Sequence, residues 1–300
     1  MSVFLSALPD AALVRLRGSK IAQFLQGQLT CDLRRLSPTQ TLTGAFCNAR
    51  GRVISDLRLI ELDAEQTLIL LRRSLCVRFA QTLQRYAQFS RIAVDSEPPG
   101  FTIAGLLAEH SPAPETLGDL APLALGQALC ADRLIAVRTG ALQYALIRHG
   151  DAAAPLAQTL NLATQAGEPE NWRAETLRNG HYALELSDSE RYTPQALNYD
   201  ERGLVAFDKG CYTGQEVVAR LHYKGKSKRR LQVYRGVGDA GEFAPGAAIR
   251  DIDGEFAGAC LRTEYTRDQA MLLAAQVPAD RRRRPIRLAN GASLEPVPAT

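Results

Sequence analysis

The sequence predicts an α+β body followed by a β-rich C-terminal domain. Two observations lead to this fold class. Up to residue 180, segments with the two-residue period of strands alternate with segments of helical period. Beyond residue 228 the helical pattern fades, and short strand-like runs follow one another between Gly, Pro and Asp turns, as in a small antiparallel barrel or sandwich. We therefore expect a body over residues 1–225, in one or two lobes, and a β-barrel over residues 226–300.

The body is expected to begin with a strand and then a helix for which Ser19 is a natural N-cap. Two strands joined by a turn at Asn48–Arg52 follow. Gly180 is expected to end the helix at 171–179, because glycine is favoured just beyond a helix C-terminus. The expected strands are 12–18, 41–48, 53–62, 67–71, 91–95, 101–107, 133–138 and 143–148, and the expected helices are 19–29, 74–88, 152–162 and 171–179. The strand-like runs of the C-terminal domain are 230–237, 247–251, 255–265, 270–277 and 285–289.

The composition is that of an ordinary globular protein. Hydrophobic residues make up 46% of the 300 residues and charged residues 23%, which argues against disorder. The six cysteines include no CxxC pair, so we expect reduced thiols. The N-terminus lacks the features of a secretory signal, and no stretch approaches the roughly 18 apolar residues of a membrane span. We therefore expect a soluble, cytoplasmic protein without a membrane partner.

The positive charges are concentrated in two runs. The net charge of +4 does not by itself indicate a nucleic-acid binder, and we do not expect direct nucleic-acid binding. The run "RRRR" (281–284), close to Pro278 and Pro285, is interpreted as a solvated loop. For "KGKSKRR" (224–230) a solvated loop and an anion site remain equally open.

The stretch "DKGCYTGQEVVAR" (208–220) contains the candidate chemistry. Thr213, followed three residues later by Glu216, fits a capping box, so a helix should start at about Gly214. Its N-terminal dipole, together with Lys209, is expected to lower the pKa of Cys211 and to make it a nucleophilic or ligand-binding thiolate. The flanking glycines, Gly210 and Gly214, would allow a ligand or partner to approach the backbone closely. The alternative is a helix start at which the cysteine fills space and the glycines serve a tight turn.

"KGCYTGQEVVAR" (209–220) resembles the signature segment of the YgfZ folate-binding proteins, which are related to the T-protein aminomethyltransferase of the glycine cleavage system and to a mitochondrial iron–sulfur assembly protein. The segments "RGSKIAQFLQGQLTCDL" (17–33), "FCNARGRVISDLRL" (46–59) and "RYTPQALNYD" (191–200) are similar to the same family, so the resemblance spans residues 17–230. It implies an aminomethyltransferase-like, tetrahydrofolate-binding body with a C-terminal antiparallel β-barrel.

The resemblance also implies a function. The family supports iron–sulfur enzymes, including tRNA-modifying ones such as tRNA methylthiotransferases, and the motif cysteine is the key side chain. Carried over to this sequence, the motif residues are Cys211 and Lys209, with a transient iron–sulfur cluster as a further expectation. A folate-associated tryptophan matches Trp172, whereas a second one has no counterpart, because Ala11 stands in its place. Lys224 and Lys226 are candidates for binding the anionic tail of the folate.

The alternative function is that of a folate-dependent one-carbon transferase. T-protein enzymes have adjacent aspartates after the glycine turn, and this sequence has Ser55-Asp56 instead. Because such a transferase needs a carboxylate to handle the folate amine, the serine argues against it. Asp56 remains a candidate for a pterin contact or, equally, a polar residue on the open face of a strand. The four histidines are too scattered for a metal site, and the sequence has no Walker A or GxGxxG motif.

Overall fold

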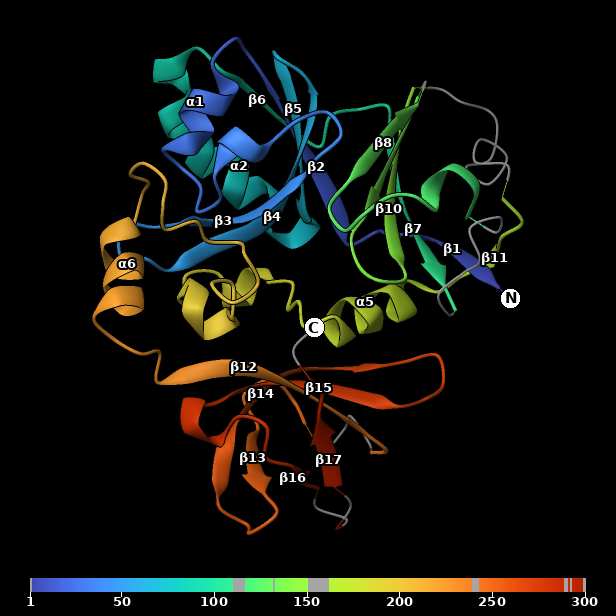
Figure 1. Cartoon of the computed structure of the whole chain (residues 1–300), viewed down its shortest axis with the longest axis vertical. Helices are drawn as coiled ribbons and strands as arrows, with labels where there is room; N and C mark the ends of the chain where they lie inside the picture. Colours follow the sequence, from blue (N-terminus) through green and yellow to red (C-terminus); the bar gives the residue numbers. More distant parts are fainter. Residues whose placement is uncertain are drawn as a thin grey trace. The chain divides into compact units, whose positions relative to one another are not determined.

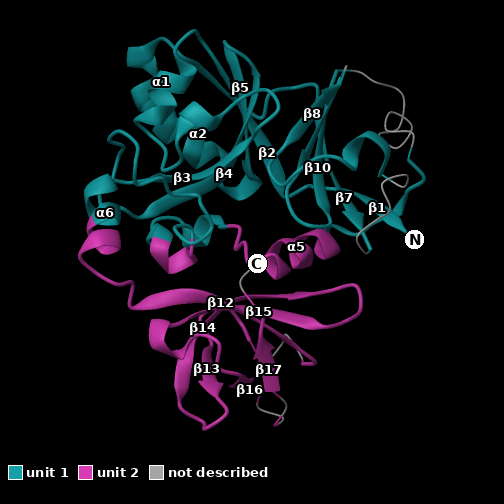
Figure 2. Ribbon diagram, in the orientation of Figure 1, with its two compact units in different colours: residues 1–169, 184–194, 199–219 teal, residues 170–183, 195–198, 220–300 magenta. Residues whose placement is uncertain are grey.

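The computed structural model describes residues 2–109, 117–131, 133–150, 162–238, 243–288, 291 and 293–298. It contains two compact units, shown in different colours in Figure 2. Unit 1 comprises residues 1–169, 184–194 and 199–219, and unit 2 comprises residues 170–183, 195–198 and 220–300. The expected helix at 152–162 falls almost entirely outside the described residues.

Unit 1 contains two sheets (Figure 1). The first has the strand order β3-β4-β5-β2-β6, with bounds Leu42–Cys47, Val53–Asp63, Gln66–Arg72, Ala11–Arg17 and Ala93–Ser96. The second has the order β11-β1-β7-β10-β9-β8, with bounds Gln165–Ala166, Val3–Ala7, Phe101–Ala108, Gln143–His149, Leu134–Arg138 and Ala128–Ala131. One buried apolar cluster draws side chains from both sheets, among them Leu13 and Ile60 from the first and Ile135 and Ile147 from the second. The two sheets of unit 1 therefore share a core.

Helix α2 (Arg73–Ala87) packs on the first sheet because its apolar residues recur at helical spacing. Leu75, Phe79 and Leu83 are completely buried, and the ring of Phe79 meets that of Phe46 on β3 edge-to-face, with 5.5 Å between centroids. Helix α1 (Ile21–Gln26) is shorter and buries Ile21, Phe24 and Leu25. The predicted N-cap at Ser19 is wrong: the N-cap is Lys20, and no side chain caps the helix.

Unit 2 contains all but the first residue of helix α5 (Pro169–Arg178), together with the C-terminal barrel. Gly180, at a φ of 75°, ends α5 as expected and donates its N–H to Leu177 O. The barrel is closed in the order β12-β15-β14-β13-β16-β17, with bounds Arg229–Gly236, Met271–Pro278, Phe256–Tyr265, Ala248–Asp251, Ile286–Arg287 and Ser293–Pro296. Closure settles the choice between barrel and sandwich and confirms the predicted fold class.

The barrel is filled by side chains, including Tyr234, Met271, Leu273 and Val277. Its curvature depends on Gly258 in β14, where a Cβ would lie 2.3 Å from the carbonyl oxygen of Gln276 on β15. The register between β13 and β14 shifts near this residue. A glycine here allows β14 to bend closely against its neighbour, as barrel closure requires.

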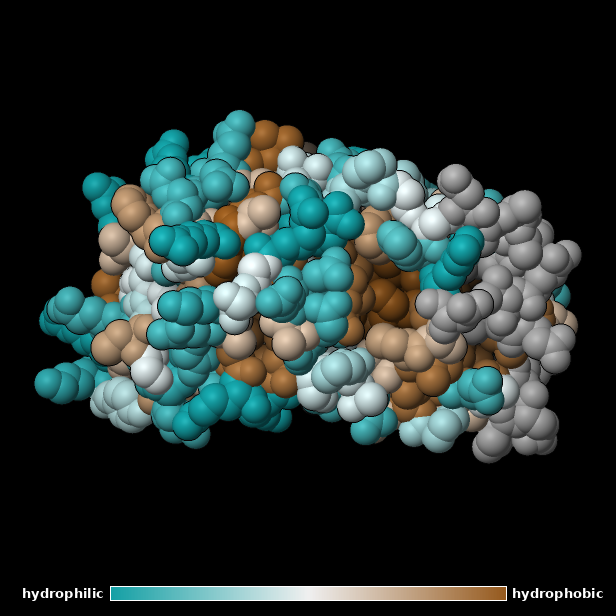
Figure 3. All heavy atoms as spheres, turned by 90° about the horizontal axis from the view of Figure 1, so that it is seen from above, coloured by the Kyte–Doolittle hydropathy of each residue, from teal (hydrophilic) through white to brown (hydrophobic). Residues whose placement is uncertain are grey.

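One face of the molecule, seen from above, has hydrophilic side chains over much of its left-hand part and an apolar hollow right of centre (Figure 3). An apolar hollow of this kind accepts many ligands and indicates no particular chemistry. Within the described ranges, no helix is long and apolar enough to cross a membrane.

Candidate functional site around Cys211

The cysteine motif lies in a loop of unit 1, residues 204–213, which we call the cysteine loop. It precedes α6 (Gln215–Tyr223) and docks on the segment that follows α1. Three hydrogen bonds join the two segments. The side chain of Thr30 donates through Oγ1 to Leu204 O at 2.6 Å, and two backbone bonds run from Ala206 N to Thr30 O at 2.9 Å and from Thr213 N to Gly27 O at 3.3 Å. The loop is therefore fixed at both of its ends.

Lys209 anchors the middle of the cysteine loop. Only 9% of its surface is exposed, and its ammonium donates to three carbonyl oxygens, those of Gln26 at 2.7 Å, Leu29 at 2.7 Å and Cys31 at 2.8 Å. Burial lowers the pKa of Lys209 to about 8, and the three carbonyls match the three protons of the charged form. The ammonium also lies 5.1 Å from the centroid of the Tyr212 ring. Lys209 therefore binds the last carbonyl of α1 and two carbonyls of the segment after it, and so holds the loop onto that segment.

The C-terminal end of the loop is fixed by two glycines that meet backbone to backbone. Gly214 has a φ of 84°, and a Cβ on it would lie 2.4 Å from the carbonyl oxygen of Asn48. A Cβ on Gly51 would lie 2.9 Å from that of Val217 on α6. The predicted turn at Asn48–Arg52 is present, and the side chain of Asn48 closes it by accepting from the N–H groups of residues 50 and 52. Gly214 therefore brings α6 onto this turn, and the backbone of the turn, not a ligand, occupies the space beside this glycine.

Helix α6 starts at Gln215, within one residue of the prediction, but the predicted capping box is wrong. The side chain that reaches back is that of Gln215, whose Oε1 accepts from the N–H of Tyr212 at 3.3 Å. In the described part of the chain, the hydroxyl of Thr213 makes no hydrogen bond to the N–H of Glu216. The sequence alone does not distinguish a cap formed by residues 213 and 216 from one formed by residues 212 and 215.

Cys211 itself is exposed, although Lys209 and Tyr212 on either side are buried. A Cβ on Gly210 would meet nothing within 4 Å, so the space beside the cysteine is open. Of the other five thiols, Cys31, Cys47, Cys76 and Cys260 are buried and Cys130 is exposed. Burial raises the pKa of each of these five, to about 11 for Cys31, about 12 for Cys47 and about 11 for Cys260. Cys211 is thus the accessible thiol that the fold holds between buried anchors.

Ser55 and Asp56 are buried within unit 1 and do not line an open strand face. Ser55 is completely buried, and its hydroxyl donates to Asp56 O at 2.7 Å. Asp56 is 6% exposed, and its Oδ1 accepts from the N–H of Leu184 at 3.2 Å. The carboxylate therefore holds the segment that starts at Leu184 against β4.

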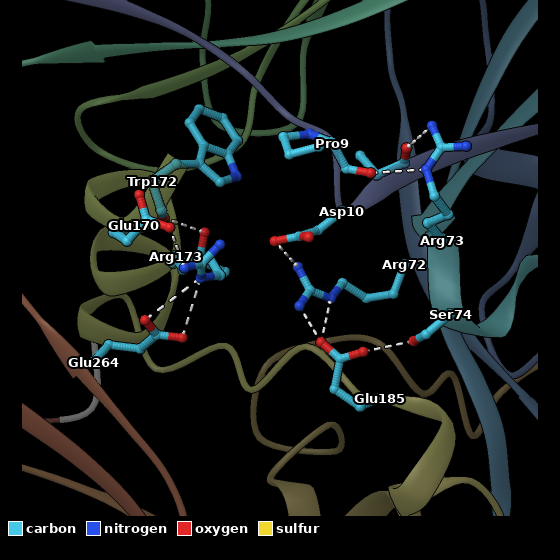
Figure 4. Close-up of polar contacts among 12 residues, drawn as sticks. Pro9, Asp10, Arg72, Arg73, Ser74, Glu170, Trp172, Arg173, Glu185 and Glu264 are labelled. Atoms are coloured by element: carbon cyan, nitrogen blue, oxygen red, sulfur yellow. Dashed lines mark hydrogen bonds and ion pairs between the residues drawn. The ribbon is translucent and has the colours of Figure 1, made fainter. Parts of the chain in front are cut away.

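Trp172, Lys224 and Lys226 belong to unit 2, whereas Cys211, Lys209 and Asp56 belong to unit 1. Trp172 lies on α5 with its ring half-buried. The next residue, Arg173, is fixed by ion pairs to Glu170 at 2.6 Å and to Glu264 at 3.5 Å (Figure 4). Lys224 and Lys226 are exposed on the segment between α6 and β12.

A second polar cluster of unit 1 was missed by sequence reasoning. Arg72, at the end of β5, donates to Glu185 and lies 3.4 Å from a carboxylate oxygen of Asp10, and Ser74 donates to Glu185 at 2.5 Å (Figure 4). Arg72 and Glu185 are far apart in sequence, and neither has a sequence feature that distinguishes it from an ordinary surface residue. The cluster ties the segment after residue 184 to β5 and α2.

Replacing Lys209 by Met should destabilise the protein by about 2–4 kcal/mol. The reason is that three carbonyl oxygens lose their donor in a site that water reaches poorly. Urea unfolding measures the change, and Lys224→Met, at an exposed position, should stay within about 0.5 kcal/mol of the parent. Equal effects of the two substitutions would show that Lys209 does not anchor the loop.

Cys211 should be the first thiol to react with iodoacetamide between pH 6 and 8. Four of the other thiols are buried, and the pKa of exposed Cys130 is raised by partial burial. Mass-spectrometric mapping of the alkylated peptides over time measures the order. Faster labelling of Cys130 than of Cys211 across this pH range would contradict the assignment.

Comparison with known proteins supports a family assignment. No protein-family model matches the chain. The protein called tRNA-modifying protein YgfZ from Yersinia pestis (strain Pestoides F) is 31% identical over 233 residues, which cover 76% of this chain and 69% of that protein. The protein of the same name from Klebsiella pneumoniae (strain 342) is 32% identical over 246 residues, covering 79% of this chain and 74% of the relative.

A solved structure is similar over nearly the whole chain. The glycine cleavage system aminomethyltransferase T from Bartonella henselae superposes with a TM-score of 0.71, covers 99% of this chain and 85% of its own, and is 17% identical. At this identity the likeness shows the fold, which is aminomethyltransferase-like. Together with the sequence identity to its relatives, it shows that the chain belongs to the YgfZ family.

Proposed function

We propose that this protein supports tRNA modification as a folate-binding accessory protein of iron–sulfur enzymes, with Cys211 as the functional thiol. The relatives' name, tRNA-modifying protein, supports the general role. The finer assignment to iron–sulfur enzymes rests on the family resemblance of the motif at 209–220, and the exposure of Cys211 is compatible with it.

The observation that carries the proposal is the exposure of Cys211 between two fixed neighbours, the buried Lys209 and the closely packed Gly214. Lys209 holds one side of the loop through three carbonyls, and Gly214 holds the other side against the Asn48 turn. A cysteine that only filled space would be buried, as Cys31 and Cys47 are. Fixed neighbours and an accessible Sγ are what a thiol needs in order to meet a partner protein or its cargo.

Cys211 can supply one thiolate ligand to an iron–sulfur cluster. Iron–sulfur clusters are usually held by about four cysteine thiolates. Besides Cys211, the only exposed cysteine of the described residues is Cys130, on β8. A cluster that reached Cys211 would therefore take its other ligands from the client enzyme or from free thiols, which suits transient transfer or repair. In this arrangement Lys209 positions the loop and does not react.

Folate binding is proposed through unit 2. The half-buried ring of Trp172 fits a role in stacking on the pterin or benzoyl ring. The exposed ammonium groups of Lys224 and Lys226 suit the carboxylates of a polyglutamate tail. Asp56 fits less well as a folate ligand, because one of its oxygens is already bonded to the N–H of Leu184.

The alternative of a one-carbon transferase has no support from these contacts. The position of the second carboxylate is taken by Ser55, which is completely buried and bonded to backbone. A transferase would need a carboxylate that can reach the folate amine. We therefore favour a binding or repair role over turnover of a folate substrate.

Cells that carry Cys211→Ser as their only copy of the protein should contain less of the methylthio-modified nucleosides made by iron–sulfur tRNA methylthiotransferases. The serine retains the shape of the side chain but not the thiolate. Mass spectrometry of digested tRNA measures the loss, and Cys130→Ser is the matched control because it also removes an exposed thiol. Normal modification in the Cys211→Ser strain, at equal protein level, would reject the proposed function.

Tetrahydrofolate should change the fluorescence of Trp172, which is the chain's single tryptophan. Calorimetric binding with unchanged fluorescence would place the ligand away from Trp172.

The polyglutamylated ligand should bind about tenfold more tightly than the monoglutamate, and the difference should shrink as salt rises, because several weak charge pairs act together. Replacing Lys224, Lys226 and Lys228 by Gln should remove most of that difference and leave monoglutamate binding nearly unchanged. Equal losses of affinity for both ligands would exclude a site for the tail at these lysines.

A further inference from the structure

The outer face of the barrel bears a row of side chains that crosses four strands. Phe256 on β14 is the register partner of Arg250 on β13, Arg250 is that of Arg287 on β16, and Arg287 is that of Ser293 on β17. All four residues are exposed. Neighbouring strands lie ~4.8 Å apart, so the row is about 14 Å wide.

The side chains of this row destabilise the protein when no partner covers them. Two arginines directly opposite each other on neighbouring strands repel. In the described part of the chain neither one has an ion pair; Arg250 donates to Gly254 O at 2.8 Å. Phe256 remains 45% exposed. Asp253 and Glu255 lie in the adjoining turn but pair with neither arginine. An anionic partner with an apolar, flat component would relieve both the repulsion and the exposure.

The arginine run at 281–284 is held near this row. Arg281 pairs with the buried carboxylate of Asp251 at 3.1 Å and donates to Phe256 O at 3.2 Å. Arg283 and Arg284 follow it, are exposed, and have no ion pair within the described residues. We call the surface formed by Arg250, Phe256, Arg283, Arg284 and Arg287 the arginine face.

We propose that the arginine face binds RNA. Guanidinium groups match phosphate oxygens in bidentate geometry, and an exposed aromatic ring on a strand offers a platform for an unpaired base. The expected ligand is therefore an RNA with accessible unpaired bases, such as the loop of a tRNA. The choice of RNA over other polyanions rests on the proposed role in tRNA modification. It departs from two expectations drawn from the sequence, that the run at 281–284 is a solvated loop and that the protein does not bind nucleic acid directly.

The test measures binding of a fluorescently labelled, unmodified tRNA transcript to the full-length protein over a range of salt concentrations. The double substitution of Arg250 and Arg287 by Gln should weaken binding at least tenfold at low salt. It should also reduce the slope of log affinity against log salt by about 1.4, since each lost phosphate contact removes about 0.7. The matched control is Arg235→Gln with Arg267→Gln, which removes the same charge near the other end of β14 and should change affinity less than about twofold. No tRNA binding by the parent protein, or equal losses in both double variants, would overturn the proposal.

Phe256 distinguishes RNA from a membrane surface. Phe256→Leu should weaken tRNA binding about fivefold or more, because it removes the stacking ring but not the apolar character, whereas Phe256→Trp should retain binding. Vesicles of anionic phosphatidylglycerol could bind instead; if the arginine double variant weakens vesicle binding, and neither it nor Phe256→Leu weakens tRNA binding, the face belongs to lipid and RNA is rejected. Cys211→Ser should leave tRNA affinity unchanged. A failure of the proposed cysteine function in cells is therefore separable from a failure of RNA binding in solution.

Discussion

Three carbonyl oxygens, one at the end of α1 and two in the segment that follows it, hold one ammonium, and the position of the cysteine loop depends on that contact. Lys209 comes from a segment about 180 residues further along the chain than the carbonyls that it binds. A buried charge without partners would cost several kcal/mol, so the loop is stable only when all three acceptors are in place. The lysine therefore couples the folding of the N-terminal segment to the position of Cys211. An exposed cysteine on a free loop would sample many positions, whereas this one is held next to buried residues.

Most of the fold could be predicted because most of its elements have a clear local period. Helix α2 and strands β2–β5, β12, β14 and β15 are long enough for apolar spacing to identify them. Strands β1, β8, β11 and β17 were missed. β11 has two residues, and β17 is short and defined by closure of the barrel. Such elements are determined by the partner strand that they meet and not by their own sequence. The misplaced caps at Ser19 and Thr213 have a related cause, since one residue of register decides which side chain reaches the backbone.

The sequence singled out Cys211 as a candidate thiol, and the structure shows it exposed, but the sequence did not reveal what surrounds it. A lysine two residues before a cysteine suggests an electrostatic partner, and the structure places that lysine on distant carbonyls instead. Likewise, a glycine before a helix suggests room for a ligand, whereas Gly214 makes room for the Asn48 turn. The row of Phe256, Arg250 and Arg287 could not be foreseen either, because strand register brings together residues up to 37 positions apart. In each case the missing information is a long-range contact.

The central claim, that Lys209 fixes the cysteine loop onto the segment after α1, is tested most directly by amide hydrogen exchange. The exchange of peptides from residues 204–214 and 24–32 should be compared between the parent protein and the Lys209→Met variant under conditions in which both are folded. Because one ammonium holds both segments, their exchange should accelerate together, while the barrel strands β12, β14 and β15 keep their protection. Unchanged protection of both segments in the variant would contradict the account, and so would acceleration confined to only one of them.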